Sequence, residues 1–165
     1  MIFVTVGNAR QRFRRLLDAV DRLAGQGIFA DEAVIIQSGH DPDFHPLHCK
    51  CIPFVPLDAF TRMLREAEVV ISHGGAGALY HAFLAGKIPV VMPRLEKYGE
   101  HVDDNQIDLV RALASEGRLV PAYEPEDLLD AVSDVRRRAP PKLYRSPTRT
   151  LSLVARAIEE LAGLA

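Results

Sequence analysis

The sequence has few cysteines, no long apolar run and little net charge, and each shortage excludes a class of protein. Cys49 and Cys51 are the two cysteines among 165 residues. One residue separates them, so they make a poor structural clamp, and this favours a reducing compartment. No apolar run approaches the ~18 residues of a membrane span. Residues 1–7 lack the basic region and cleavage site of a signal peptide. We therefore expect a cytoplasmic protein.

The net charge is −2, from 20 basic and 22 acidic residues, so nucleic acid is not an expected partner. Residues 136–165 nevertheless carry seven of the basic residues and two of the acidic ones. This basic stretch is interpreted either as a solvated helix end and loop or as a docking surface for an anionic membrane or acidic partner. The content of apolar residues (48%) and charged residues (25%) is typical of a globular domain.

Short apolar runs alternate with stretches of helical periodicity along the chain. The predicted strands are residues 2–6, 33–37, 52–55, 69–72, 88–92 and 119–121. The predicted helices are residues 10–24, 57–67, 78–85, 104–116, 124–138 and about 148–161. This alternation predicts an α/β fold, a Rossmann-like doubly wound parallel sheet of about six strands. We expect one domain, 1–165, in which 147–165 is a C-terminal helix that docks on a partner or completes the core. In such folds the ligand binds at the carboxyl ends of the strands.

One glycine-rich turn, residues 73–77, joins a predicted strand to a helix. Glycine allows the backbone to approach a ligand closely, and a helix start offers free amides and partial positive charge, which suit a diphosphate. Tight turns also favour glycine for purely structural reasons. Tyr80 occupies the third glycine position of a dinucleotide-binding motif, and Ile88 after Gly86-Lys87 excludes a P-loop. The nucleophile elbow of α/β-hydrolases is absent as well.

A second segment, residues 93–106, is rich in polar and titratable side chains that could bind the hydroxyls of a sugar. The alternative is a solvated loop in which Asp103 or Asp104 caps a helix. No metal is expected. Residues 45–51 contain four side chains of zinc-binding type, but they are too crowded to surround one ion. Asp41-Pro42-Asp43 is typical of a turn.

Residues 2–7, 70–77 and 93–106 together resemble the C-terminal, donor-binding domain of glycosyltransferase family 28, over about residues 1–130. Within the family the sequence is most similar to the small subunits of split enzymes of the dolichol pathway and of bacterial exopolysaccharide biosynthesis. The resemblance implies one half of a GT-B fold that binds a UDP-sugar and needs no cofactor. It also implies a membrane-associated partner subunit that binds a lipid-linked, polyprenyl-diphosphate acceptor. The protein would then transfer a hexosyl or N-acetylhexosaminyl group at the cytoplasmic face of the membrane.

The resemblance also implies roles for individual residues. Those expected near the diphosphate are Gly7, Asn8, Gly74, Gly75, Ala76 and Gly77. Those expected near uracil and ribose are Phe54, Val55 and His81. Those expected near the sugar are Glu100, His101, Asp104 and Gln106, with Gln106 favoured for a hydroxyl contact. The sequence departs from the family pattern at Asn8, His81 and Asn105, where Thr, Glu and His are usual.

The general base is expected on the partner, and His73 and His101 are the candidates in this chain. Two other functions stay open. One is a non-catalytic nucleotide-sugar-binding or scaffold module of the same fold. The other is a homodimeric transferase that works without a second kind of chain.

Overall fold

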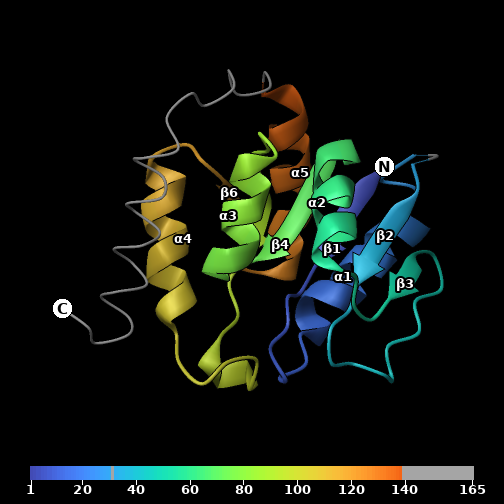
Figure 1. The fold of residues 1–165 in the computed structure, drawn as a ribbon, viewed down its shortest axis with the longest axis horizontal. Coiled ribbons are helices and arrows are strands. Elements are labelled where there is room, and N and C mark those ends of the chain that lie inside the picture. The colour runs from blue at the N-terminus through green and yellow to red at the C-terminus, as the bar shows by residue number, and fades with distance from the viewer. Residues whose placement is uncertain (31, 139–165) are drawn as a thin grey trace.

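The computed structural model describes residues 1–30 and 32–138 and confirms the predicted α/β class (Figure 1). Six strands form one parallel sheet in the order β3-β2-β1-β4-β5-β6. They are β1 (Ile2–Thr5), β2 (Val34–Gln37), β3 (Lys50–Ile52), β4 (Val69–His73), β5 (Val90–Met92) and β6 (Val120–Pro121). This order places β1 beside β4, with Thr5 opposite Ser72. The chain reverses its direction of travel across the sheet between these two strands, which is where Rossmann-like folds bind ligands.

Helices cover both faces of the sheet. They are α1 (Arg14–Gly25), α2 (Leu57–Glu66), α3 (Ala76–Leu84), α4 (Asn105–Ser115) and α5 (Leu128–Arg137), with short 3₁₀ turns η1 (Glu96–Tyr98) and η2 (Pro125–Asp127). Residues of α1 and α5 pack on one face, against side chains such as Val4 and Ile71. Residues of α2, α3 and α4 pack on the other, against Phe3, Val70 and Val91. Because both faces are buried, the strands are apolar throughout rather than alternating.

The third strand differs from the prediction: it spans Lys50–Ile52, not residues 52–55. Pro53 has no N–H to donate to the sheet. Its carbonyl instead accepts hydrogen bonds from the backbone of Gly39 and the side chain of Gln37. Phe54 and Val55 therefore lie beyond the strand, in the segment that leads into α2. The predicted helix at about 148–161 lies outside the described residues.

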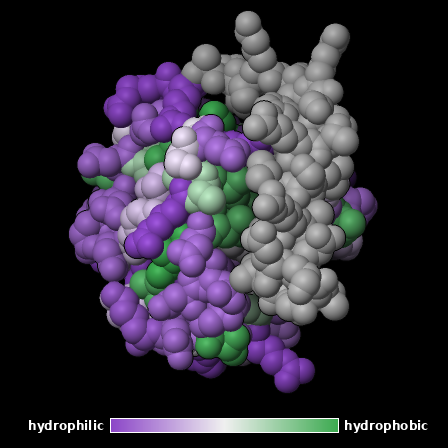
Figure 2. Space-filling view, turned by 90° about the vertical axis from the view of Figure 1, so that its left-hand side faces the viewer, coloured by the Kyte–Doolittle hydropathy of each residue, from purple (hydrophilic) through white to green (hydrophobic). Residues whose placement is uncertain are grey.

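The described part of the basic stretch is paired with acidic residues at the end of α5. Arg136 pairs with Glu32 and lies 3.6 Å from Glu68, and Arg138 bonds Asp134 at 2.7 Å. For these residues the structure favours the solvated helix end over a free docking surface. Figure 2 shows a face on which hydrophobic residues lie in patches among hydrophilic ones. Within the described residues, every helix is too short or too polar to cross a membrane.

Two leucines of α2 allow a matched test of the core. Leu64 is fully buried against the sheet, whereas Leu57 on the same helix is 62% exposed. We expect Leu64→Ala to lower the free energy of unfolding by about 2–5 kcal/mol, because it leaves a cavity. Leu57→Ala should change it by less than about 0.5 kcal/mol. Urea denaturation followed by circular dichroism measures both, and equal losses in the two variants would contradict this packing.

Candidate functional site

Two glycine turns meet at the carboxyl ends of β1 and β4, with the ring of His73 between them. Gly7 follows β1 with a φ of +70°, a conformation that side chains disfavour. A Cβ atom placed on Gly7 would lie 2.4 Å from His73 Cε1, and one placed on Gly75 would lie 2.1 Å from His73 Nε2. Neither position therefore has room for a side chain while the ring stays in place. The structure thus brings Gly7, His73 and Gly75 into one cluster.

The imidazole of His73 is buried, and its Nδ1 has no hydrogen-bond partner among the described residues. Burial lowers the pKa of His73 to about 3, and the charges of Arg94 and His101 act in the same direction. The ring is therefore neutral at physiological pH. A group with this pKa is a weak general base, which disfavours that role for His73.

The amino end of α3 lies directly after this cluster. Gly75 is its N-cap residue, and the amides of Ala76, Gly77 and Ala78 have no acceptor within the described part of the chain. Gly77 is exposed, and a Cβ placed on it would have no atom within 4 Å. Free amides and the partial positive charge of a helix start favour an anion here.

The loop after β5 reaches the glycine turn through Gln106, at the start of α4. A Cβ on Gly74 would lie 3.0 Å from the Cβ and 3.1 Å from the Oε1 of Gln106. That Oε1 accepts a hydrogen bond from the backbone N–H of Arg94 at 3.1 Å, which fixes the amide group. Gln106 therefore lies against the glycine turn, at the edge of the sheet where its sugar contact was predicted. The contact itself stays a prediction.

Arg94 begins this loop and is completely buried. Its Nη2 donates to the carbonyl of Val6 at 2.7 Å, and its Nη1 donates to the carbonyls of Gln11 at 2.8 Å and Glu100 at 3.0 Å. The guanidinium carbon also lies 4.8 Å from the centre of the Phe13 ring. One side chain thus ties the Gly7 turn, the start of α1 and the loop after β5 together. Burial lowers the pKa of Arg94 to about 10, which still leaves it charged at neutral pH.

Glu100 is buried within the same loop and is held by Arg15 of α1. The Nε and Nη2 of Arg15 donate to its two carboxylate oxygens at 3.0 and 2.8 Å, and the backbone N–H of Leu95 adds a third bond at 3.0 Å. Both carboxylate oxygens of Glu100 are therefore engaged within the protein. A sugar contact by Glu100 stays a prediction that this geometry does not favour.

The polar residues beside Glu100 bond mainly to one another. His101 Nδ1 lies 3.0 Å from Asp103 Oδ1, whose carboxylate also accepts from the backbone and side chain of Asn105. Asp104 accepts from the backbone of Glu96 at 2.8 Å. Asp103 thus accepts from the amide of the first residue of α4, whereas the N-cap residue Asp104 makes no side-chain capping bond. The sugar contacts of His101 and Asp104 are not tested by these bonds.

The residues predicted near uracil and ribose lie around α2. Phe54 is 44% exposed, and its ring packs against His40 with the ring centres 4.8 Å apart. His81 of α3 lies 6.0 Å from the ring of Phe60 in α2. Its neighbour Tyr80 also contacts it, at 5.4 Å. Asn8, which was predicted near the diphosphate instead, is exposed in the turn after β1. The nucleoside contacts of Phe54, Val55 and His81 stay predictions.

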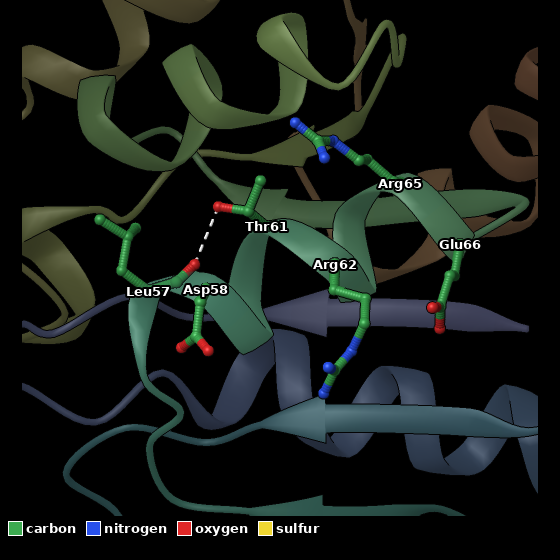
Figure 3. A pocket seen from close by; sticks show the side chains of 6 residues that line it. All are labelled: Leu57, Asp58, Thr61, Arg62, Arg65 and Glu66. Carbon is green, nitrogen blue, oxygen red and sulfur yellow. Dashed lines mark hydrogen bonds between the residues drawn. The ribbon is translucent and has the colours of Figure 1, made fainter.

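A hollow on the outer surface of α2 does not coincide with the glycine turns (Figure 3). It is lined by Leu57, Asp58, Thr61, Arg62, Arg65 and Glu66. All six belong to one exposed helix face, which is typical of a surface groove rather than a binding site. Within the described residues, His, Cys, Asp and Glu side chains form no cluster of three that could hold a metal ion.

Sequence reasoning assigned no function to Arg94, Arg15 or Gln37. Gln37 pairs with the Thr5 hydroxyl, and its amide nitrogen donates to the carbonyls of Gly7 and Pro53 at 3.2 Å each. It therefore braces the Gly7 turn from the opposite side to Arg94. The signal that could have revealed Arg94 is its place directly after an apolar strand, next to Pro93.

The buried neutral His73 predicts a dependence of stability on pH. The pKa of histidine is about 6.5 in an unfolded chain, so as the pH falls the unfolded chain takes up the proton first. Stability is therefore lost from about pH 6.5 downwards, by about 2 kcal/mol at pH 5. Between pH 7 and pH 5, the free energy of unfolding of His73→Asn should fall by about 2 kcal/mol less than that of the wild type, as measured by urea denaturation. His45→Asn, at an exposed histidine, should behave like the wild type. An unchanged pH dependence in His73→Asn would contradict the neutral ring.

Comparisons with known proteins identify the family and support the fold. The chain matches the glycosyltransferase family 28 C-terminal domain over residues 1–161. A comparison with curated proteins gives no match. Among solved structures, the chain is similar to the glycotransferase of kitacinnamycin, with 18% identity and a TM-score of 0.63 over 96% of this chain and 39% of that one.

Two further glycosyltransferase structures share the fold. The calicheamicin glycosyltransferase is 22% identical with a TM-score of 0.58, over 98% of this chain and 41% of that one. SnogD from Streptomyces nogalater is 20% identical with a TM-score of 0.56, over 99% of this chain and 43% of that one. The chain thus spans about 40% of the length of these structures. The match over residues 1–161 confirms the resemblance found in the sequence: the chain belongs to the glycosyltransferase family 28 C-terminal domain family.

Proposed function

We propose that this chain is the donor-binding subunit of a UDP-sugar-dependent glycosyltransferase. The observation that carries the proposal is the cluster of Gly7, His73 and Gly75 at the amino end of α3. Two turns without room for side chains border a neutral imidazole and three helix-start amides that have no acceptor among the described residues. Backbone that carries no side chains beside the start of a helix is suited to binding a diphosphate.

The departure of UDP from the sugar builds negative charge on the diphosphate. The amides of Ala76, Gly77 and Ala78, at the start of α3, would stabilise that charge where it develops, without a metal ion. The neutral His73 adds no positive charge, and its ring lies between the two glycine turns, where a Cβ on either glycine would meet it. Gln106 lies on the far side of Gly74, where the sugar attached to the diphosphate would extend.

The acceptor site belongs to the other half of a GT-B enzyme in this proposal. The chain matches the C-terminal domain of the family and covers about 40% of the similar structures, which supports its assignment to one half of such an enzyme. We propose that a membrane-associated subunit provides the acceptor-binding half and the general base. The acceptor would be a lipid-linked polyprenyl diphosphate in exopolysaccharide or related glycan synthesis, so that the partner recruits this chain to the cytoplasmic face of the membrane.

Gly77 provides a sharp test of the diphosphate position. Gly77→Asp has space in the free protein, and an acidic residue in the first turn of a helix is favourable, so the fold should be retained. The new carboxylate should weaken UDP binding by about tenfold or more, because like charges repel at close range. Calorimetric titration with UDP measures the affinity.

Ala112→Asp, on the exposed side of α4, introduces the same charge elsewhere and should bind UDP like the wild type. Equal affinities of Gly77→Asp and the wild type would place the diphosphate somewhere else. If neither the chain nor its complex binds UDP, the non-catalytic scaffold is favoured. The observation behind that alternative is His81, which packs on aromatic rings at a position where the family usually has Glu.

Turnover tests the division of labour. We expect this chain alone to transfer no sugar, and to gain activity on membranes when it is produced together with the product of the neighbouring reading frame. A panel of radiolabelled UDP-sugars identifies the donor by incorporation into lipid extracts. The variant Gly77→Asp in the same complex is the matched control and should be strongly impaired. Turnover by the purified chain without a partner would instead support the homodimeric enzyme.

A further inference from the structure

Two arginines beside the site, the buried Arg94 and the partly buried Arg15, differ in how their charges are balanced. Arg15 has two carboxylates within 4 Å, those of Glu100 at 2.8 Å and Glu124 at 3.7 Å. Arg94 has no carboxylate within 4 Å among the described residues, since Glu100 offers it only its backbone carbonyl. The Nε of Arg94 also has no hydrogen-bond partner among the described residues. Arg94 is therefore a buried cation held by carbonyl dipoles and one aromatic ring.

A buried cation without a direct ion pair is costly, because its lost hydration is only partly replaced. The carboxylate of Glu100 favours the charge of Arg94 from beyond 4 Å. Three carbonyls and the face of Phe13 provide part of the replacement. The remaining positive potential is felt by neighbouring groups. Arg94 is among the causes that lower the pKa of His73, whose ring lies between the Gly7 and Gly75 turns. An anion bound at those turns would experience the same potential as an attraction.

The backbone bonds of Arg94 give it a second effect at the same place. They hold Val6, which precedes Gly7, and the loop that carries Gln106 in one arrangement. We propose that Arg94 is a positioning residue whose buried charge, which makes no ion pair within 4 Å among the described residues, is balanced in part by the diphosphate of the donor. It thereby favours a diphosphate over an uncharged ligand while it fixes the two loops. This inference rests on the proposed function, because it assigns the diphosphate to the same turns.

The affinity ratio of UDP to uridine tests the charge separately from the fold. NMR titration of the full chain with each ligand measures both dissociation constants. In Arg94→Met the affinity for UDP should fall by about tenfold or more, and that for uridine by much less. Arg94→Lys keeps the charge and should keep most of the UDP preference. Arg111→Met removes a charge from an exposed side chain (68% exposed) and should leave both constants unchanged.

A purely structural role would weaken UDP and uridine alike in Arg94→Met, and that result would overturn the proposal. If Arg94→Met does not fold, Arg94→Gln replaces it, because its amide can still donate to one of the carbonyls without carrying charge. The ratio of the UDP affinity to the uridine affinity of Arg94→Gln then tests the role of the charge. Loss of the UDP preference in Arg94→Lys, with uridine binding retained, would also overturn the role of the charge.

Inorganic pyrophosphate separates this inference from the proposed function. It should raise the thermal unfolding temperature of the wild type and Arg111→Met, but much less that of Arg94→Met or Arg94→Gln. If pyrophosphate acts in this way and UDP does not bind, the anion site stands and the nucleotide donor fails. If UDP binds and its preference over uridine is independent of Arg94, the donor site stands and this inference fails. No effect of either ligand on the wild type overturns both.

Discussion

The parallel pairing of β1 with β4 is the constraint on which the site depends. It places Thr5 opposite Ser72, so β1 and β4 end beside each other at the same edge of the sheet. The turn at Gly7 and the turn at Gly74-Gly75 then have the ring of His73 between them. A side chain on either glycine would meet that ring. The pairing of β1 with β4 therefore leaves room for glycine alone at both positions while the ring stays in place. The amino end of α3 receives its position from the same arrangement.

Buried polar side chains, rather than further secondary structure, hold the loops around these turns. Gln37 fixes the carbonyl of Gly7 from one side, and Arg94 fixes the carbonyl of Val6 from the other. The ion pair of Arg15 with Glu100 then secures the loop after β5 to α1. Hydrogen bonds to charged groups in a low-dielectric environment are strong, and an unpaired partner is costly. Such a network resists partial loosening, which suits loops that must be in place before a ligand arrives.

Local patterns in the sequence were sufficient to predict the fold class, the glycine-rich turn at residues 73–77 and the polar loop after β5, and the family resemblance added Gly7. The strand order could not be predicted, because pairing in a parallel sheet is not encoded by the residues that adjoin each strand. Arg94 and Glu100 were not predicted to be buried, since arginine and glutamate are rarely buried unless they are paired. The third strand was misplaced because Ile52, Phe54 and Val55 are all typical strand residues. Pro53 nevertheless ends the pairing after Ile52.

The pKa values of His73 and Arg94 have a consequence for the behaviour of the site under acid stress. One is lowered to about 3 and the other to about 10, so neither group gains or loses a proton when the pH falls from neutral by one or two units. The local charge that a ligand meets from these two side chains is therefore constant over that range. Acidification would act on the population of folded molecules, through the cost of the buried imidazole, before it altered these two groups in the molecules that remain folded.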